Sequence, residues 1–135
     1  MIIGLDHVAI AVEPLQEAIR RFAEDFGLDF AGIEEVTAAK TTTAFFPLKG
    51  TQLELIHPLN GEGPVQRYLE KRGPGLHHIA FKSDDILADM NRLTQKGYQL
   101  LSNEPKLGAH GSQTVFVHPR STGGVLIELV QHAEP

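Results

Sequence analysis

The chain has 135 residues, with 17 acidic side chains, 12 basic side chains, seven histidines and no cysteine. This length predicts one compact domain, and the lack of cysteine excludes disulfides, thiol catalysis and thiolate metal ligands. The net charge of −5 argues against nucleic-acid binding, which needs a basic surface to displace counterions from phosphates. No apolar stretch approaches the roughly 20 residues that cross a bilayer, and the start lacks the basic segment of a secretory signal. We therefore expect a cytoplasmic protein that binds neither nucleic acid nor a membrane.

One motif occurs twice in the chain. The segment Leu5–Ala9 aligns with Leu76–Ala80 at a shift of 71 residues, so that a leucine, a histidine and an alanine coincide. Each segment precedes a stretch with apolar residues three and four apart, which predicts a helix, and Gly27 and Gly97 are placed to end these helices. Two apolar runs then follow in each half, at 43–46 and 52–56 and again at 114–117 and 126–130. Each half is therefore expected to contain a strand, a helix and about three strands.

The two halves are expected to fold together. A module of about 65 residues with a four-stranded sheet and one helix leaves a sheet face uncovered. We therefore predict an α+β protein made of two tandem βαβββ modules, residues 1–60 and 75–132, within one domain. Pairing the modules would give a curved mixed sheet with helices outside. Residues 61–74 have turn residues around a short amphipathic pattern, which predicts a helical linker.

Four polar residues stand at equivalent places in the two halves. His7 and His78 occupy the same position in their strands, and Glu54 and Glu128 each interrupt a later apolar strand. A carboxylate in the middle of a strand is costly unless it is solvated, paired or coordinated. Two imidazoles and two carboxylates are a donor set for Co, Ni, Mn, Fe or Zn. The four residues therefore form either a shared divalent-metal site or four ordinary half-exposed strand positions.

Three further residues are candidate substrate contacts. Lys106 and His110 lie in a glycine-containing segment, and Arg120 lies in a second segment that ends in two glycines. His110 could touch a substrate from a loop. Lys106 and Arg120 are candidate phosphate contacts if the substrate carries phosphates.

Five motifs together resemble a known family over nearly the whole chain. They are LDHVAIAV at 5–12, LELIHPL at 53–59, GLHHIAF at 75–81, EPKLG at 104–108 and HPRSTGGVLIEL at 118–129. The chain resembles the methylmalonyl-CoA epimerase family, which belongs to the vicinal oxygen chelate superfamily with the glyoxalase fold. The last three motifs are fairly specific to the epimerase branch, whereas a strand histidine followed by a helix marks only the superfamily.

The resemblance implies a metal site, a substrate and an assembly. His7, Glu54, His78 and Glu128 would bind a divalent metal, often cobalt in this family, with Ni, Mn, Zn or Fe as alternatives. Some relatives have glutamine at the position of Glu54, so this chain would bring one extra negative charge to the metal. The resemblance also implies an acyl-CoA substrate and a homodimer.

The implied reaction inverts the carbon between a thioester and a carboxylate. One base removes the proton from one face, and a second acid returns a proton on the other. Glu128 is the expected residue for one of these roles. Thr42 stands, by our alignment, where some relatives have the second carboxylate, and a threonine hydroxyl cannot serve as that base. The second group is therefore open.

Three alternatives accompany this hypothesis. Lactoylglutathione lyase, of the glyoxalase I type, can use the same two histidines and two glutamates to isomerise a hemithioacetal. A ring-cleaving dioxygenase is disfavoured because it typically uses two histidines and one carboxylate with open positions. A non-catalytic small-molecule-binding module of the same fold would not need all four ligands.

Overall fold

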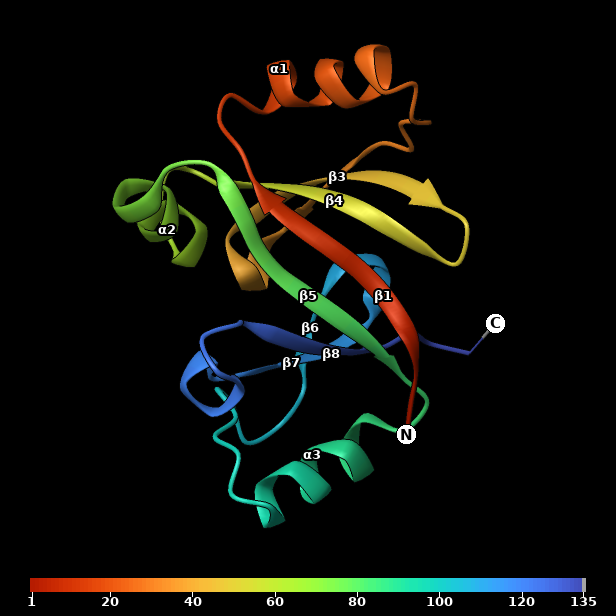
Figure 1. The fold of residues 1–135 in the computed structure, drawn as a ribbon, viewed down its shortest axis with the longest axis vertical. Helices are drawn as coiled ribbons and strands as arrows, with labels where there is room; N and C mark the ends of the chain where they lie inside the picture. Colours follow the sequence, from red (N-terminus) through yellow and green to blue (C-terminus); the bar gives the residue numbers. More distant parts are fainter. Residues whose placement is uncertain (135) are drawn as a thin grey trace. The chain divides into compact units, whose positions relative to one another are not determined.

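The computed structural model describes residues 1–134 and contains two strand–helix–three-strand repeats (Figure 1). The first repeat has β1 (Ile2–Ala11), α1 (Leu15–Arg20), β2 (Ile33–Val36), β3 (Thr41–Leu48) and β4 (Thr51–Pro58). The second has β5 (Gly75–Ser83), α3 (Ile86–Gln95), β6 (Lys106–Leu107), β7 (Gln113–Val117) and β8 (Ile127–Gln131). Between them lies α2 (Pro64–Arg72), in the segment predicted as a helical linker.

Short helical turns complete the secondary structure. A π-helical turn, Arg21–Asp25, extends α1, and 3-10 turns occupy Thr37–Ala39, Ala109–Gly111 and Pro119–Thr122. Gly27 and Gly97 follow the two repeated helices with φ of 71° and 92°. This left-handed region favours glycine, so both residues end helices as their sequence positions predicted.

The described residues group into two compact units, and each unit contains one four-stranded arrangement. The first unit is His7–His77, and the second combines residues 1–6 with residues 78–134. In the first unit the strand order is β2-β3-β4-β1, with β1 parallel to β4 and the other pairs antiparallel. In the second unit the order is β6-β7-β8-β5, with β5 parallel to β8 and the other pairs antiparallel. The duplication read from the sequence is therefore present in the strand pairing.

In the first unit, helices cover both faces of the sheet. The helix α1 lies over one face of the sheet (Figure 1). Its Ala18 and Ile19 pack against Phe46 and Leu55. The helix α2 covers the other face, where a second cluster of buried side chains comprises Ala9, Ala11, Ile56, Val65 and Leu69. Because side chains alternate along a strand, residues next to each other in β1 or β4 belong to different clusters. Along these strands, alternate residues therefore contact α1 and α2.

In the second unit, α3 packs on the face of β7 and β8 that corresponds to the α1 face. Ile86 and Met90 of α3 form a buried cluster with Val115 and Leu129. Asp85 caps the start of α3, because its side chain accepts a hydrogen bond from the backbone N–H of Ala88 at 3.1 Å. The apolar stripe predicted for this helix therefore points into the core of its unit.

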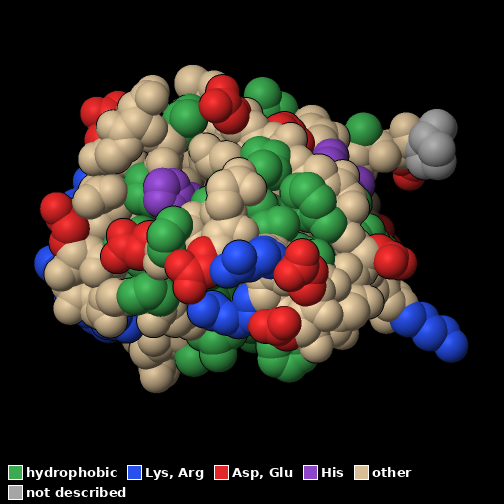
Figure 2. All heavy atoms as spheres, turned by 90° about the horizontal axis from the view of Figure 1, so that it is seen from above, with side chains coloured by type: hydrophobic (Ala, Val, Ile, Leu, Met, Phe, Trp, Pro, Cys, Tyr) green, Lys and Arg blue, Asp and Glu red, His purple; other side chains and the backbone are tan. Residues whose placement is uncertain are grey.

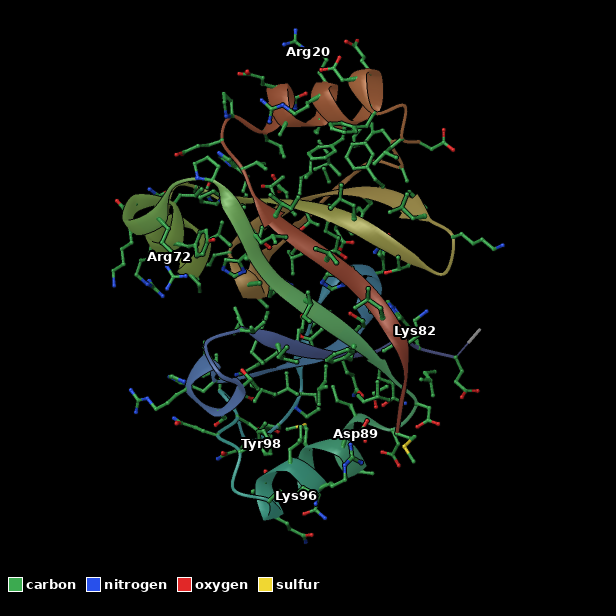
Figure 3. The ribbon with its side chains drawn as sticks, in the orientation of Figure 1. Arg20, Arg72, Lys82, Asp89, Lys96 and Tyr98 are labelled. Carbon is green, nitrogen blue, oxygen red and sulfur yellow. The ribbon has the colours of Figure 1, made fainter. Side chains whose placement is uncertain are left out.

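A buried carboxylate ties α3 to β5. Asp89 lies on α3 (Figure 3). It is fully buried and accepts a hydrogen bond from Ser83 Oγ at 2.5 Å. Arg92 Nη1 and the Met1 amino group lie 2.6 Å and 2.9 Å from Asp89 Oδ1. Burial raises the pKa of Asp89, but the hydrogen bonds from Ser83, Met1 and Arg92 together outweigh it and hold this pKa below its ordinary value. The ionised form of Asp89 therefore stabilises the folded state.

No helix in the described part of the chain is both long and apolar enough to cross a membrane.

On the face drawn in Figure 2, Lys and Arg side chains lie beside Asp and Glu side chains, with hydrophobic side chains between them. An ion pair along α1 and the turn that follows it joins Arg21 and Glu17, whose charged atoms are 3.9 Å apart with both side chains more than half exposed. Exposed ion pairs of this kind contribute little to stability. The polar groups with the larger energetic consequences are therefore the buried ones of the two sheets.

Replacing Asp89 by asparagine is expected to lower the free energy of unfolding by about 3 kcal/mol, because the hydrogen-bonded donors lose their charged partner. The pKa of Asp89 is lowered in the folded state, so its stabilisation is present above the ordinary carboxyl pKa and is lost as the pH falls through the folded-state pKa. Urea unfolding at pH 7 and below pH 4 should show the difference shrinking in acid. The exposed Asp84→Asn is the control, with an expected loss under about 1 kcal/mol. An equal decrease in the free energy of unfolding for both variants would mean that the burial of Asp89 does not strengthen its contribution to stability.

Candidate functional site

In the first unit, β1 and β4 place a histidine and a glutamate side by side. The parallel register pairs Ala9 with Glu54, and His7 precedes Ala9 by two residues, so His7 and Glu54 share a face. His7 Nδ1 lies 3.2 Å from Glu54 Oε2, and the two residues are 5% and 6% exposed. Gln52 Nε2 donates a further hydrogen bond to Glu54 at 3.0 Å. The two residues form a buried imidazole–carboxylate pair rather than two half-exposed surface groups.

The second unit repeats this pair. The register of β5 and β8 pairs Ala80 with Glu128, and His78 precedes Ala80 by two residues. His78 Nε2 lies 3.1 Å from Glu128 Oε1, and both residues are buried. The ring of Phe116 meets the His78 ring edge-on, with the centroids 5.1 Å apart. The imidazole is therefore held between a carboxylate and an aromatic ring.

The surroundings of the two pairs also correspond. Phe45 stands opposite Glu54 in the β3–β4 ladder, and Phe116 stands opposite Glu128 in the β7–β8 ladder. The neighbouring residues Ala9 and Ala80 are both fully buried. A larger side chain at either alanine would occupy space next to the carboxylate. Each module thus builds the same set of histidine, alanine, glutamate and phenylalanine on one face of its sheet.

The donor chemistry of both pairs fits a divalent metal ion. Ligands about 2.1 Å from one ion and at right angles to each other lie about 3.0 Å apart. The nitrogen–oxygen separations of 3.2 Å and 3.1 Å in the two units are close to this value. Ligation would use neutral imidazoles and ionised carboxylates, and it would offset the cost of burying the carboxylate charge. His7, Glu54, His78 and Glu128 are therefore able to act as metal ligands.

The three candidate substrate residues differ in their placement. Lys106 pairs with Thr114 in the β6–β7 ladder, and Thr114 lies two residues before Phe116, so Lys106 is on the face of Glu128. His110 is exposed in a turn with a φ of 57°. Arg120 is exposed in the turn after β7, where its backbone N–H donates to His118. Of these three residues only Lys106 is carried by a strand on the face of Glu128, and the contacts of all three with a substrate stay predictions.

The structure places Thr42 away from the first pair. In the β3–β4 ladder Phe45 stands opposite Glu54, Thr43 opposite Ile56 and Thr42 opposite His57. A shift of one residue in a strand moves a side chain to the other face. Thr42 is therefore on the α1 face, while the neighbouring Thr43 is on the face of Glu54.

One contact near the site is not predictable from the sequence pattern. That pattern gives His132 no role, yet its Nε2 lies 2.6 Å from Oδ1 of the buried Asp6. Asp6 is adjacent to His7 in the strand motif, and an aspartate among apolar strand residues requires a partner. That requirement is visible in the sequence, whereas the identity of the partner depends on the fold.

Comparison with known proteins identifies the family of the chain. A model of the Glyoxalase/Bleomycin resistance protein/Dioxygenase superfamily matches residues 6–116. The chain belongs to this superfamily. The ethylmalonyl-CoA/methylmalonyl-CoA epimerase of Cereibacter sphaeroides is 40% identical over 133 residues, which cover 97% of this chain and 99% of that protein.

Solved structures of the superfamily extend the comparison. The methylmalonyl-CoA epimerase of Mycobacterium tuberculosis has a TM-score of 0.94 at 34% identity, covering 98% of this chain and 90% of that one. A Streptomyces coelicolor methylmalonyl-CoA epimerase variant in complex with 2-nitronate-propionyl-CoA has a TM-score of 0.93 at 31% identity, covering 99% and 100%. The two βαβββ modules predicted from the repeated motif and the glyoxalase fold implied by the family resemblance are confirmed.

Proposed function

We propose that this chain is a metal-dependent methylmalonyl-CoA epimerase that interconverts the two C2 epimers of its substrate. The observation that carries the proposal is the pair of equivalent buried imidazole–carboxylate contacts, His7 with Glu54 and His78 with Glu128. The similarity to epimerases over nearly the full length of the chain supports the same conclusion. In this proposal the four residues hold one divalent ion, with Co²⁺ favoured and Ni²⁺, Mn²⁺, Zn²⁺ or Fe²⁺ as alternatives.

The chemistry requires a stabilised negative charge and two proton transfers. The C2 hydrogen lies between a thioester and a carboxylate and is only weakly acidic. A bound divalent ion supplies Lewis-acid stabilisation for the oxygen on which charge develops. Glu128 is proposed to accept the C2 proton on one face, because its carboxylate is buried and held at 3.1 Å from His78 in the matching motif. In the low-dielectric surroundings of a buried site, such charge interactions are stronger than in water.

Other residues are proposed to bind the rest of the substrate. An acyl-CoA carries several phosphates and, in this substrate, a carboxylate on the acyl group. Lys106 and Arg120 are cationic and exposed, and His110 is exposed in the glycine-containing turn between β6 and β7. We assign them contacts with these anionic groups.

The second candidate is lactoylglutathione lyase. The observation that favours it is the presence of glutamate at both carboxylate positions, since bacterial members can use the same two histidines and two glutamates. The epimerase motifs at Leu76–Phe81 and Pro119–Leu129 favour the first proposal. A non-catalytic binding module is disfavoured because it would not need the complete donor set in both units.

Organisation and assembly complete the proposal. A single domain of two modules joined by the 61–74 segment follows from the sequence pattern, and a homodimeric, cytoplasmic enzyme follows from that pattern together with the family resemblance. The occurrence of α2 within that segment supports the linker assignment.

We expect metal-stripped protein to bind Co²⁺ with an increase in melting temperature, because ligands present in the folded state bind the ion and the unfolded chain does not. His7→Ala and His78→Ala should each weaken binding at least about 10-fold in isothermal titration. The control is His57→Ala, because His57 lies on β4 on the face opposite to Glu54. Equal affinities for wild type, His7→Ala and His78→Ala would reject the shared site.

The reaction itself is tested by NMR in heavy water with methylmalonyl-CoA and Co²⁺-loaded enzyme. We expect exchange of the C2 proton for deuterium and interconversion of the two epimers, both lost when the metal is stripped and recovered on reloading. The hemithioacetal of methylglyoxal and glutathione is assayed in parallel. Isomerisation of the hemithioacetal without exchange on methylmalonyl-CoA would replace the first proposal by the second.

Glu128→Gln is expected to lower the epimerisation rate at least about 100-fold, because an amide cannot accept the C2 proton. The variant should keep the circular dichroism spectrum of the wild type. Its Co²⁺ affinity must be measured alongside, because Glu128 is also a proposed ligand and metal loss would give the same drop in rate. An unchanged rate at saturating metal would remove Glu128 from the mechanism.

A further inference from the structure

The proposed epimerisation needs a second proton-transfer group, and the strand register of the first unit indicates one. Glu34 of β2 stands opposite Thr43 of β3, and Thr43 stands opposite Ile56 of β4. Residues that face one another across a ladder share a face, and Ile56 lies two residues after Glu54. Glu34 therefore lies on the face of Glu54. We propose that Glu34 is the second acid–base group of the reaction, an inference that rests on the proposed epimerase function.

Burial along β2 supports this orientation. Glu34 is half-buried and Val36 is buried, whereas Ile33 and Glu35 are exposed. The alternation agrees with the register, which puts Glu34 and Val36 on the face of Glu54. Glu35, which stands opposite Thr42, points to the other side. Two adjacent glutamates of the same strand therefore face opposite directions, and only Glu34 faces the same way as Glu54.

Glu34 and Glu54 lie at a distance that the side chains and one small acyl group can bridge. Glu34 and Glu54 are two strands apart and one pleat repeat apart along the strand, which corresponds to about 12 Å between their Cα atoms. The buried Thr43 stands between them on the intervening strand, and its side chain is shorter than that of Glu34. The Glu34 carboxylate can thus approach a substrate carbon held near Glu54 without itself being one of the proposed metal ligands.

Among the strand residues of its unit, Glu34 is the best candidate for the second acid–base group. The structure describes every residue of His7–His77, and the acidic residues on its strands are Glu34, Glu35 and Glu54. Glu35 faces away, and Glu54 already belongs to the pair with His7. In the second unit the equivalent position, opposite Thr114, is Lys106. The proposed carboxylate therefore belongs to the first module alone, and Glu128 to the second.

The proton balance closes with these two residues. One carboxylate takes the C2 proton, so the C–H bond breaks, an O–H bond forms, and the electron pair moves toward the thioester oxygen. The other residue, protonated beforehand, gives its proton to C2 on the opposite face as the electron pair returns. The two residues have then exchanged protonation states, and exchange with water or reverse turnover restores them.

The test separates the two half-reactions in heavy water, starting from each epimer in turn. Glu34→Gln is expected to lower epimerisation at least about 100-fold while deuterium still enters C2 of one epimer through Glu128. Glu35→Gln is the matched control, with both rates unchanged. Glu34→Ala provides a second variant, in which added formate should restore part of the epimerisation by replacing the missing carboxylate. Co²⁺ affinity and circular dichroism of each variant should equal those of the wild type.

Three outcomes would overturn the inference. One is wild-type epimerisation in Glu34→Gln, another is equal loss of exchange from both epimers at unchanged Co²⁺ affinity, and the third is the same defect in Glu35→Gln. A wild type that exchanges neither epimer would instead reject the epimerase function, so the two failures are distinguishable.

Discussion

The burial of two carboxylates on β4 and β8 is the constraint on which the remaining features of the site depend. Glu54 and Glu128 are 6% and 7% exposed, and a buried carboxylate without a charge or hydrogen-bond partner is strongly destabilising. Each is placed next to an imidazole by the parallel pairing of the first and last strands of its module. The small residues Ala9 and Ala80 are required beside them, since a large apolar neighbour would remove the space that a ligand needs.

The same constraint explains why one face of the first sheet is apolar and the other carries the polar site residues. The face toward α1 is filled by side chains such as Phe46 and Leu55 and supplies hydrophobic stabilisation. The opposite face carries His7 and Glu54, and α2 covers it only around Ala9, Ala11 and Ile56. The polar site is therefore concentrated on one face and apolar packing on the other. A substitution on the α1 face is expected to act through folding, whereas one beside His7 and Glu54 acts through chemistry.

Much of this arrangement is predictable from the sequence, because a residue type that recurs at the same position in both halves supports the same assignment twice. His7 and His78 are each followed two residues later by alanine, and two-residue periodicity is enough to predict their shared face. The position of Thr42 is different. Family resemblance brings Thr42 near the second carboxylate of some relatives, but the register places it with His57 on the α1 face. Alignment to within one residue is sufficient to predict a strand and insufficient to predict which face a side chain is on.

Long-range polar contacts are the other part that the sequence does not predict. The sequence indicates that Asp6 and Asp89 need partners, because both are acidic residues within apolar patterns. Their partners are His132, distant in sequence, and the Ser83 and Arg92 side chains, whose roles depend on the packing of α3 against β5. A hydrophobic stripe can be read from spacing alone, whereas a hydrogen-bond partner is defined only by coordinates.

The two modules also differ where the proposed reaction needs them to differ. The histidine, alanine, glutamate and phenylalanine positions repeat, which suits a metal ion that accepts the same donors from both modules. Methylmalonyl-CoA has no such symmetry, since one substituent of C2 is a thioester and another is a carboxylate. The repeat is broken opposite Thr43 and Thr114, where Glu34 stands in one module and Lys106 in the other. Opposite charges at these equivalent positions make the two modules chemically different, which the repeated histidine and glutamate positions do not.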